Sequence, residues 1–146
     1  MRQHTLIDTY HDEETHAYCV TIGTDMGAFL GCVQCREEDY PHESQFFGFE
    51  LAEIKAEIEY ARAKRDHWNT QLLALNNYWR GMAGTRNYDG NAYWVKQLRH
   101  AVDHAADQRD YWVDEIDALK RTYLTTIIAR DKLMKKLDKV QGVKND

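Results

Sequence analysis

Residues 47–82, FGFELAEIKAEIEYARAKRDHWNTQLLALNNYWRGM, place apolar side chains at alternating spacings of four and three residues. The series is Phe47, Leu51, Ile54, Ile58, Ala61, Arg65, Trp68, Leu72, Leu75, Trp79 and Met82, and only Arg65 in it is not apolar. So long an uninterrupted series is typical of a coiled-coil seam. It predicts one helix over about 44–82, roughly 60 Å long at about 1.5 Å per residue.

A second stripe with the same spacing follows the segment AGTRNYDGN, whose two glycines and Asp-Gly step interrupt the helical pattern. The stripe runs through Val95, Leu98, Val102, Ala105, Arg109, Trp112, Ile116, Leu119, Tyr123, Thr126, Arg130, Leu133, Leu137 and Val140. It predicts a second helix over about 91–141. Helices of this length need a partner along the seam, and the short connection predicts that they pair as an antiparallel hairpin.

The two arginines of the stripes have a specific expected position. An antiparallel pairing centred in the connection sets Arg65 opposite Trp112 and Arg109 opposite Trp68. We expect each guanidinium to stack on the opposing indole ring, which would fix the register of the helices. The alternative is that both arginines extend to solvent beside the seam.

Residues 1–42 predict a separate acidic module built on a β-hairpin. The segments AYCVTI (17–22) and AFLGCVQC (28–35) have strand composition, and GTDMG between them is a turn signal. TLIDTY (5–10) is a candidate third strand. The chain is therefore predicted to be an α+β protein, predominantly α, in which this module precedes a helical hairpin over 43–146.

Four residues of this module are of metal-ligating types: His16, Cys19, Cys32 and Cys35. Their spacing resembles a generic treble-clef or ribbon zinc knuckle, which would imply a structural zinc site. In a regular hairpin, however, Cys19 faces Cys32 and His16 faces Cys35, and strand alternation sends these pairs to opposite faces. We therefore expect free thiols and no metal. Zinc is the alternative, and a redox role for the CVQC thiols is a third possibility.

Other residues that could serve catalysis are expected to be solvated. His100 and His104 lie four residues apart beside the second stripe and point to solvent. The first helix carries an acidic face without the Glu-x-x-His repeats of di-metal bundles, formed by Glu50, Glu53, Glu57 and Glu59. Phosphate-binding glycine loops and nucleophile motifs are missing from the sequence, so we expect no enzymatic activity.

Charge is divided unevenly along the chain. Residues 1–59 contain thirteen acidic residues against three basic ones, whereas residues 60–146 contain sixteen basic residues against eleven acidic ones. The basic excess gathers near the C-terminus, at Arg130, Lys132, Lys135, Lys136 and Lys139. Both regions can be ordinary solvated faces. The functional interpretation is an acidic N-terminal part that meets a basic partner.

The apolar stripe of the second helix continues beyond the expected end of the first. Leu133, Leu137 and Val140 have no counterpart in the first helix and must pack on the N-terminal module or on another chain. Ile127 and Ile128 widen the apolar face in the same region. We therefore expect a homodimer that forms through Ile127, Ile128, Leu133 and Leu137.

Two groups of residues are predicted to bind a partner. One surrounds the connection between the helices and has the composition of interface hot spots: Arg86, Tyr88, Tyr93 and Trp94. The other is acidic: Asp12, Glu13, Glu14, Glu37, Glu38 and Asp39. Small acidic proteins of this shape without catalytic motifs look like accessory proteins of phages and mobile elements, including inhibitors of host nucleases such as anti-CRISPR proteins.

The expected function is that of a non-enzymatic protein-binding module, which docks on a larger macromolecular machine and inhibits or modulates it. The alternative is a zinc-stabilised nucleic-acid-binding or transcription-associated protein, whose basic C-terminal helix contacts phosphates. We expect a cytoplasmic protein, because the N-terminus lacks the pattern of a signal peptide and an odd number of cysteines does not suit a disulfide framework. No apolar run is long enough to span a membrane.

Overall fold

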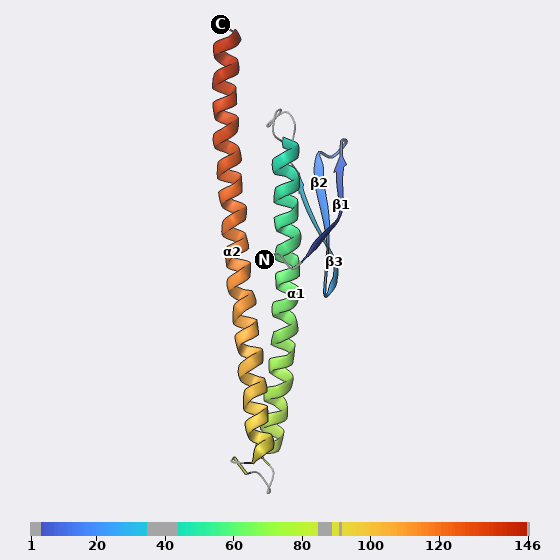
Figure 1. Cartoon of the computed structure of the whole chain (residues 1–146), viewed down its shortest axis with the longest axis vertical. Coiled ribbons are helices and arrows are strands. Elements are labelled where there is room, and N and C mark those ends of the chain that lie inside the picture. Colours follow the sequence, from blue (N-terminus) through green and yellow to red (C-terminus); the bar gives the residue numbers. More distant parts are fainter. Residues whose placement is uncertain (1–3, 35–43, 85–88, 91, 146) are drawn as a thin grey trace. The chain divides into compact units, whose positions relative to one another are not determined.

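The computed structural model describes residues 4–34, 44–84, 89–90 and 92–145. Three strands precede two long helices: β1 (Thr5–Asp12), β2 (Ala17–Thr24), β3 (Gly27–Gln34), α1 (Ser44–Ala83) and α2 (Tyr93–Asn145) (Figure 1). The predicted α+β architecture is confirmed, and the third strand is present. Neither helix is long and apolar enough over its described residues to cross a membrane.

The chain divides into two compact units. The sheet unit comprises Met1–Tyr60 and Asp117–Asp146, and the tip unit comprises Ala61–Ile116. The sheet and the first part of α1 thus belong to the same unit, while the tip unit contains the end of α1 and the beginning of α2.

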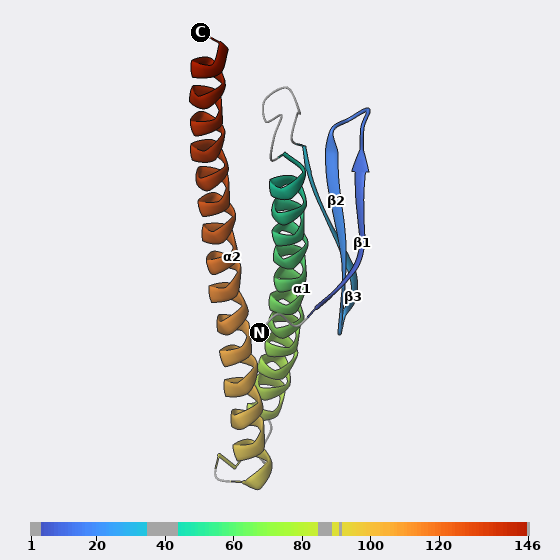
Figure 2. The ribbon, with the colours of Figure 1, turned by 45° about the horizontal axis from the view of Figure 1, so that its top comes forward.

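The sheet is antiparallel with strand order β1-β2-β3 (Figure 2). Thr24 pairs with Gly27 across a turn at Asp25 and Met26, and Cys19 lies directly opposite Cys32, so the predicted hairpin register is confirmed. The Thr24 hydroxyl donates a hydrogen bond to the Gly27 carbonyl (2.8 Å). Gly27 has a φ of 106°, a conformation that residues with a Cβ rarely adopt, which accounts for glycine at this position.

Alternation along the strands gives the sheet a buried inner face and an exposed outer face. Tyr18, Val20, Ile22 and Val33 are buried, whereas the alternating residues Cys19, Thr21 and Cys32 are not. The register of β1 shifts between Leu6 and Asp8, which is a β-bulge. The inserted Ile7 lies against Gly23. A Cβ added to that glycine would be 2.9 Å from the Ile7 Cδ1. The bulge therefore places Ile7 on the outer face.

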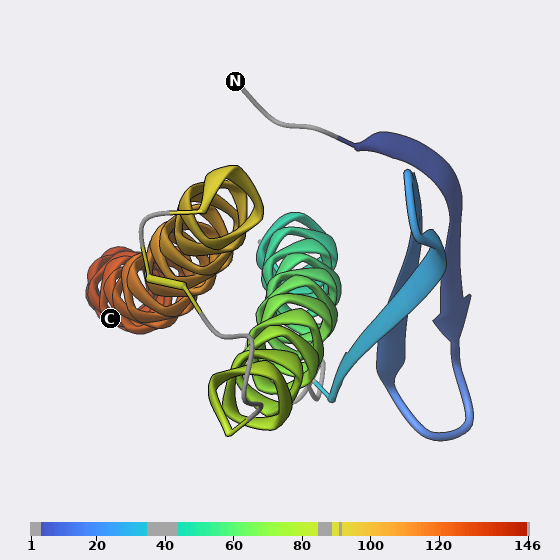
Figure 3. The ribbon, with the colours of Figure 1, turned by 90° about the horizontal axis from the view of Figure 1, so that it is seen from below.

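Within the sheet unit, α1 buries two separate faces. One is the predicted seam, in which Leu51, Ile54 and Ile58 are buried. The other faces the sheet (Figure 3) and consists of residues four apart, Gly48, Ala52, Ala56 and Tyr60.

The helix face that meets the sheet consists mostly of small residues because the backbones approach closely there. A Cβ on Gly31 of β3 would overlap the Ala52 carbonyl oxygen, and a Cβ on Gly48 would overlap the Tyr18 ring. At the end of this row, the Tyr60 hydroxyl donates a 2.6 Å hydrogen bond to Asp25 in the β2–β3 turn. We call Gly48, Ala52 and Ala56 the small-residue row.

The helices of the tip unit are antiparallel neighbours, as predicted. Trp68 of α1 meets His104 of α2 edge-on at 5.3 Å between ring centroids. The Lys64 ammonium lies 5.9 Å from the Trp112 ring centroid, and the Arg99 guanidinium lies 5.4 Å from that of Trp79.

The two arginines of the stripes lie differently from the stacked arrangement that we expected. Arg65 pairs with Asp66 at 3.1 Å, and Arg109 pairs with Asp110 at 2.9 Å. Their side chains are 35% and 33% exposed, which corresponds to the alternative of arginines that extend to solvent. In each pair the guanidinium has a charged partner, the adjacent aspartate, and both groups remain hydrated. The guanidinium therefore avoids the cost of losing its water against an indole ring.

The seam of α2 departs from the predicted stripe near its C-terminal end. Met134 is buried, whereas the predicted Leu133 is exposed and Ile127 is half-buried. Steps of three and four residues that strictly alternate average about 3.5 residues per turn, whereas a straight helix has about 3.6. A stripe that stays on one side of a straight helix therefore includes an occasional additional step of four residues. After Tyr123, half-buried residues lie both on the predicted stripe, at Thr126, Arg130 and Leu137, and one residue beyond it, at Ile127 and Asp131.

Candidate functional site

The outer face of the sheet carries three large apolar side chains that are open to solvent. Ile7 and Tyr10 of β1 are each 59% exposed, and Leu30 of β3 is 58% exposed. Tyr10 pairs with Cys19, and Leu30 pairs with Thr21. Cys19 and Thr21 both belong to β2, the strand between β1 and β3. We call this surface the outer sheet face. Large exposed apolar side chains gathered on one surface are typical of interaction sites.

The same sheet is strongly acidic. Residues 4–34 contain no lysine or arginine, and their acidic residues are Asp8, Asp12, Glu13, Glu14 and Asp25. Asp8 pairs with Thr21 and Asp12 with Ala17, which places both carboxylates on the outer sheet face. Asp12 also accepts a hydrogen bond from the Glu14 backbone N–H (2.9 Å), which orders the turn after β1.

The structure brings together only part of the predicted partner-binding residues. Asp12, Glu13 and Glu14 lie together at one end of the sheet, while Glu37, Glu38 and Asp39 lie outside the described residues. Of the aromatic group, Arg86 and Tyr88 also lie outside them. Tyr93, which is exposed, and Trp94, which is half-buried, begin α2 in the tip unit.

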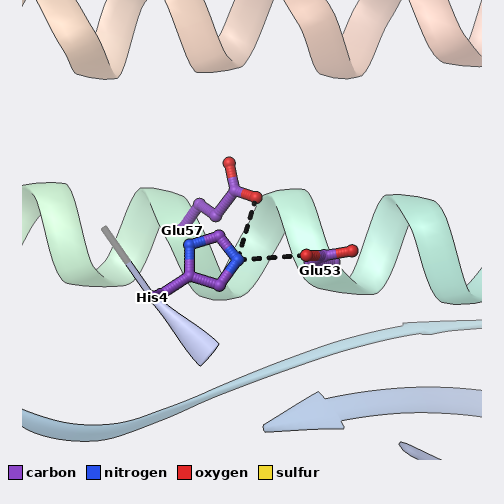
Figure 4. A network of polar contacts seen from close by, with 3 residues as sticks. All are labelled: His4, Glu53 and Glu57. Atoms are coloured by element: carbon purple, nitrogen blue, oxygen red, sulfur yellow. Dashed lines mark hydrogen bonds and ion pairs between the residues drawn. The ribbon is translucent and has the colours of Figure 1, made fainter. Parts of the chain in front are cut away.

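A polar cluster that we did not predict joins the start of the described chain to α1 (Figure 4). The His4 Nε2 lies 3.0 Å from Glu53 Oε1 and 3.6 Å from Glu57 Oε1. The two glutamates are one helical turn apart, so both carboxylates project from the same side of α1. The interpretation of these glutamates as a solvated acidic face is wrong for Glu57, which is 9% exposed and contacts His4.

The chemistry of this cluster is that of a buried contact between an imidazole and two carboxylates. The His4 side chain is only 7% exposed. Its contact with Glu53 is a hydrogen bond when Nε2 carries the ring's single proton, and an ion pair when both ring nitrogens are protonated. The three ligand atoms lie within 4.8 Å of one another, and a divalent cation can accept such a donor set. The direct contacts join His4, which immediately precedes β1, to α1.

Two thiols lie side by side on the outer sheet face. Cys19 is half-buried, Cys32 is exposed, and both are free. Burial and, to a smaller extent, a hydrogen bond with the Cys32 side chain together raise the pKa of the Cys19 thiol from 9.0 to about 11. Of the other residues with zinc-knuckle spacing, His16 lies in the β1–β2 turn with a φ of 57°, and Cys35 lies outside the described residues.

The histidines of α2 lie where we expected them. Both His100 and His104 are exposed, and the His104 ring contacts Trp68 across the helix pair. A shallow surface pocket of about 260 Å³ lies near them and is lined by Asn76, Trp79, Arg99, Val102 and Asp103. Its volume is below the range of about 300–1,000 Å³ that is usual for small-molecule sites.

Comparisons with known proteins add nothing to these observations, because no family model, curated protein or solved structure matches the chain.

Proposed function

We propose that this chain is a non-enzymatic protein-binding module that docks on a larger macromolecular machine and inhibits or modulates it. The observation that carries the proposal is the outer sheet face, where Ile7, Tyr10 and Leu30 are exposed on a sheet with five acidic residues and no basic one. An apolar centre with a charged rim is the usual composition of a protein interface.

The charge of the sheet indicates what kind of partner it would accept. Asp8 and Asp12 flank the apolar side chains, so a complementary surface combines an apolar patch with lysine and arginine. Proteins that bind nucleic acids have basic surfaces of this kind. A module bound there would exclude the nucleic acid.

The specific form of the proposal is therefore a phage or mobile-element inhibitor of a host defence nuclease, similar in action to anti-CRISPR proteins. A cytoplasmic location belongs to the same proposal, because such nucleases act in the cytoplasm. β1 also offers a free edge in the described sheet, since the strand order leaves its outer side unpaired. A partner strand can add to such an edge.

The test is a binding measurement with a matched control. A partner is first captured from a host lysate on the immobilised chain and purified, and its affinity is then measured for three forms of the chain. The Tyr10→Ala/Leu30→Ala variant removes the apolar centre of the outer sheet face. The Leu73→Ala/Tyr78→Ala variant removes the same residue types from exposed positions of α1.

We expect the Tyr10→Ala/Leu30→Ala variant to lose at least about 30-fold in affinity, which is the effect of removing one hot-spot residue, whereas the control retains affinity. Equal affinity of both variants would overturn the proposal. If the purified chain instead bound duplex DNA with steep salt dependence, the alternative function through the basic end of α2 would be favoured.

Charge provides a second arm of the same measurement. Replacing Asp12, Glu13 and Glu14 by the corresponding amides should reduce the association rate and weaken its dependence on salt, because these groups steer a basic partner. An association rate that is unchanged at low ionic strength would rule out an electrostatic role for this turn.

A further inference from the structure

We propose that Cys19 and Cys32 are a redox modification site, at which a low-molecular-weight disulfide such as oxidised glutathione converts the two thiols into a cross-strand disulfide. The site lies on the outer sheet face. Regulation of partner binding by this bond rests on the proposed function, whereas formation of the bond does not.

The hairpin register places the two cysteines at a position that suits a disulfide. Residues opposite each other in antiparallel strands alternate between hydrogen-bonded and non-hydrogen-bonded pairs. Thr24 and Gly27 flank the two-residue turn, a position that is normally a hydrogen-bonded pair, and we take the alternation from there. Counting away from the turn, Val20 and Gly31 are again hydrogen-bonded, and the next pair, Cys19 and Cys32, is not.

A non-hydrogen-bonded pair brings its side chains together. The Cα atoms of such a pair are about 4.5 Å apart, at the short end of the range of about 4.4–6.8 Å seen for disulfides. The Cys32 side chain is also a hydrogen-bond partner of the Cys19 thiol. Both sulfurs lie on the outer face, so oxidation requires neither a strand shift nor opening of the core.

The exposure of the two thiols sets the order of the steps. Cys32 is exposed and reacts first: its thiolate attacks one sulfur of the small disulfide, forms a mixed disulfide and releases one small thiolate. Cys19 then loses its proton and attacks the Cys32 sulfur, which releases the second small thiolate. The two protons from the cysteines go to the released thiolates, and the small disulfide takes up two electrons.

The raised pKa of Cys19 agrees with this order. A thiol with a pKa of about 11 is almost entirely protonated near neutral pH and is a poor first nucleophile. Once Cys32 carries a mixed disulfide, proximity compensates for the small thiolate fraction of Cys19, because the second step takes place within one hairpin.

The bond would change the proposed binding surface. Tyr10 pairs with Cys19, and Leu30 is two residues from Cys32 on the same face of β3. A covalent bridge between these positions fixes β2 against β3 and removes the flexibility with which the face could adapt to a partner. We expect the oxidised form to melt at a higher temperature and to bind the partner with altered affinity.

The experiment uses the full chain, incubated with oxidised glutathione and then alkylated under non-reducing conditions. Trypsin is unsuitable because no lysine or arginine lies between Arg2 and Arg36, so all three cysteines remain in one peptide. Cleavage before aspartate separates Cys19 from Cys32 at Asp25. The expected product is a cross-link between these two peptides that is lost after reduction.

Variants identify the bond. Cys35→Ser should form the cross-link and show the rise in melting temperature, whereas Cys19→Ser should retain only a glutathione adduct on Cys32. A bond between Cys32 and Cys35, or a glutathione adduct on wild-type Cys32 that never resolves, would overturn the modification site.

The same preparations separate this inference from the proposed function. If the cross-link forms but the oxidised and reduced chains bind the purified partner with equal affinity, the regulatory part is wrong and the modification site stands. Failure of the Tyr10→Ala/Leu30→Ala variant to lose affinity would instead contradict the proposed function without affecting the disulfide.

Discussion

The imidazole of His4 lies between the carboxylates of Glu53 and Glu57 in a mostly buried site. Its removal would leave two acidic side chains facing each other from one turn of α1. We expect His4→Ala to lower the free energy of unfolding by about 1–3 kcal/mol, the usual cost of leaving a buried polar group without its partner. The exposed His100→Ala serves as the control and should change stability by less than about 0.5 kcal/mol.

Urea denaturation at neutral pH measures both variants. The double variant His4→Ala/Glu57→Gln should be less destabilised than His4→Ala, because it removes one of the two carboxylates. If Zn²⁺ raised the melting temperature of the wild type but not of His4→Ala, the cluster would bind a cation in addition to holding the N-terminal segment. Equal stability of His4→Ala and the wild type would contradict the structural role.

At the scale of elements, the contact between the sheet and α1 depends on the absence of side chains. A Cβ on Gly31 would overlap the backbone of α1 at Ala52. Backbone cannot move aside as a flexible side chain can, so the sheet and the helix would have to separate. The small-residue row thus determines which side of α1 the sheet covers.

We therefore expect Gly31→Ala to lower the free energy of unfolding by about 1–3 kcal/mol, which is the usual effect of overpacking a core. Gly81→Ala is the matched control: this glycine lies in α1 with nothing within 4 Å of an added Cβ, and alanine there should raise helix stability by up to about 1 kcal/mol. Thermal denaturation followed by circular dichroism distinguishes the two. A Gly31→Ala variant as stable as the wild type would show that the sheet is not closely packed on the helix.

At the scale of the whole molecule, α2 is longer than α1, with 53 residues against 40. The Lys55 ammonium lies 5.8 Å from the Tyr123 ring centroid. The helices are antiparallel, so the start of α1, eleven residues before Lys55, lies opposite Met134, eleven residues after Tyr123. The last turns of α2 therefore extend past α1 with apolar side chains among them. Ile128 and Leu133 are about 140° apart around the helix, so the predicted dimer residues do not form one face. Leu133, Leu137 and Val140 do share a side.

We expect the chain to form a dimer through this side of α2. Leu133→Lys/Val140→Lys should convert it into a monomer, because burying two ammonium groups opposes association. Leu73→Lys, which places one ammonium group at an exposed apolar position of α1, should leave the dimer intact. Size-exclusion chromatography with light scattering gives the mass of each form. A monomeric wild type at micromolar concentration would refute the dimer.

The features that could be predicted from the sequence are those with a local cause. The two stripes predict the helices because their spacing matches the helical period, and the two-residue turn predicts the pairing of Cys19 with Cys32 because each later pair follows by counting. The acidic character of the sheet can also be read directly from residues 4–34. None of these features requires knowledge of what lies beside them in space.

The remaining features depend on contacts between residues that are distant along the chain. His4 and Glu53 are separated by 49 residues, and nothing in either neighbourhood marks them as partners. The small-residue row has no apolar signal of its own, and the position of Arg65 depends on a balance between hydration and stacking. The elements and the strand register follow from periodicity and turn geometry, which are local properties of the chain. Which side of α1 meets the sheet, and which side chains remain exposed, depend instead on how closely two backbones can approach in the folded protein.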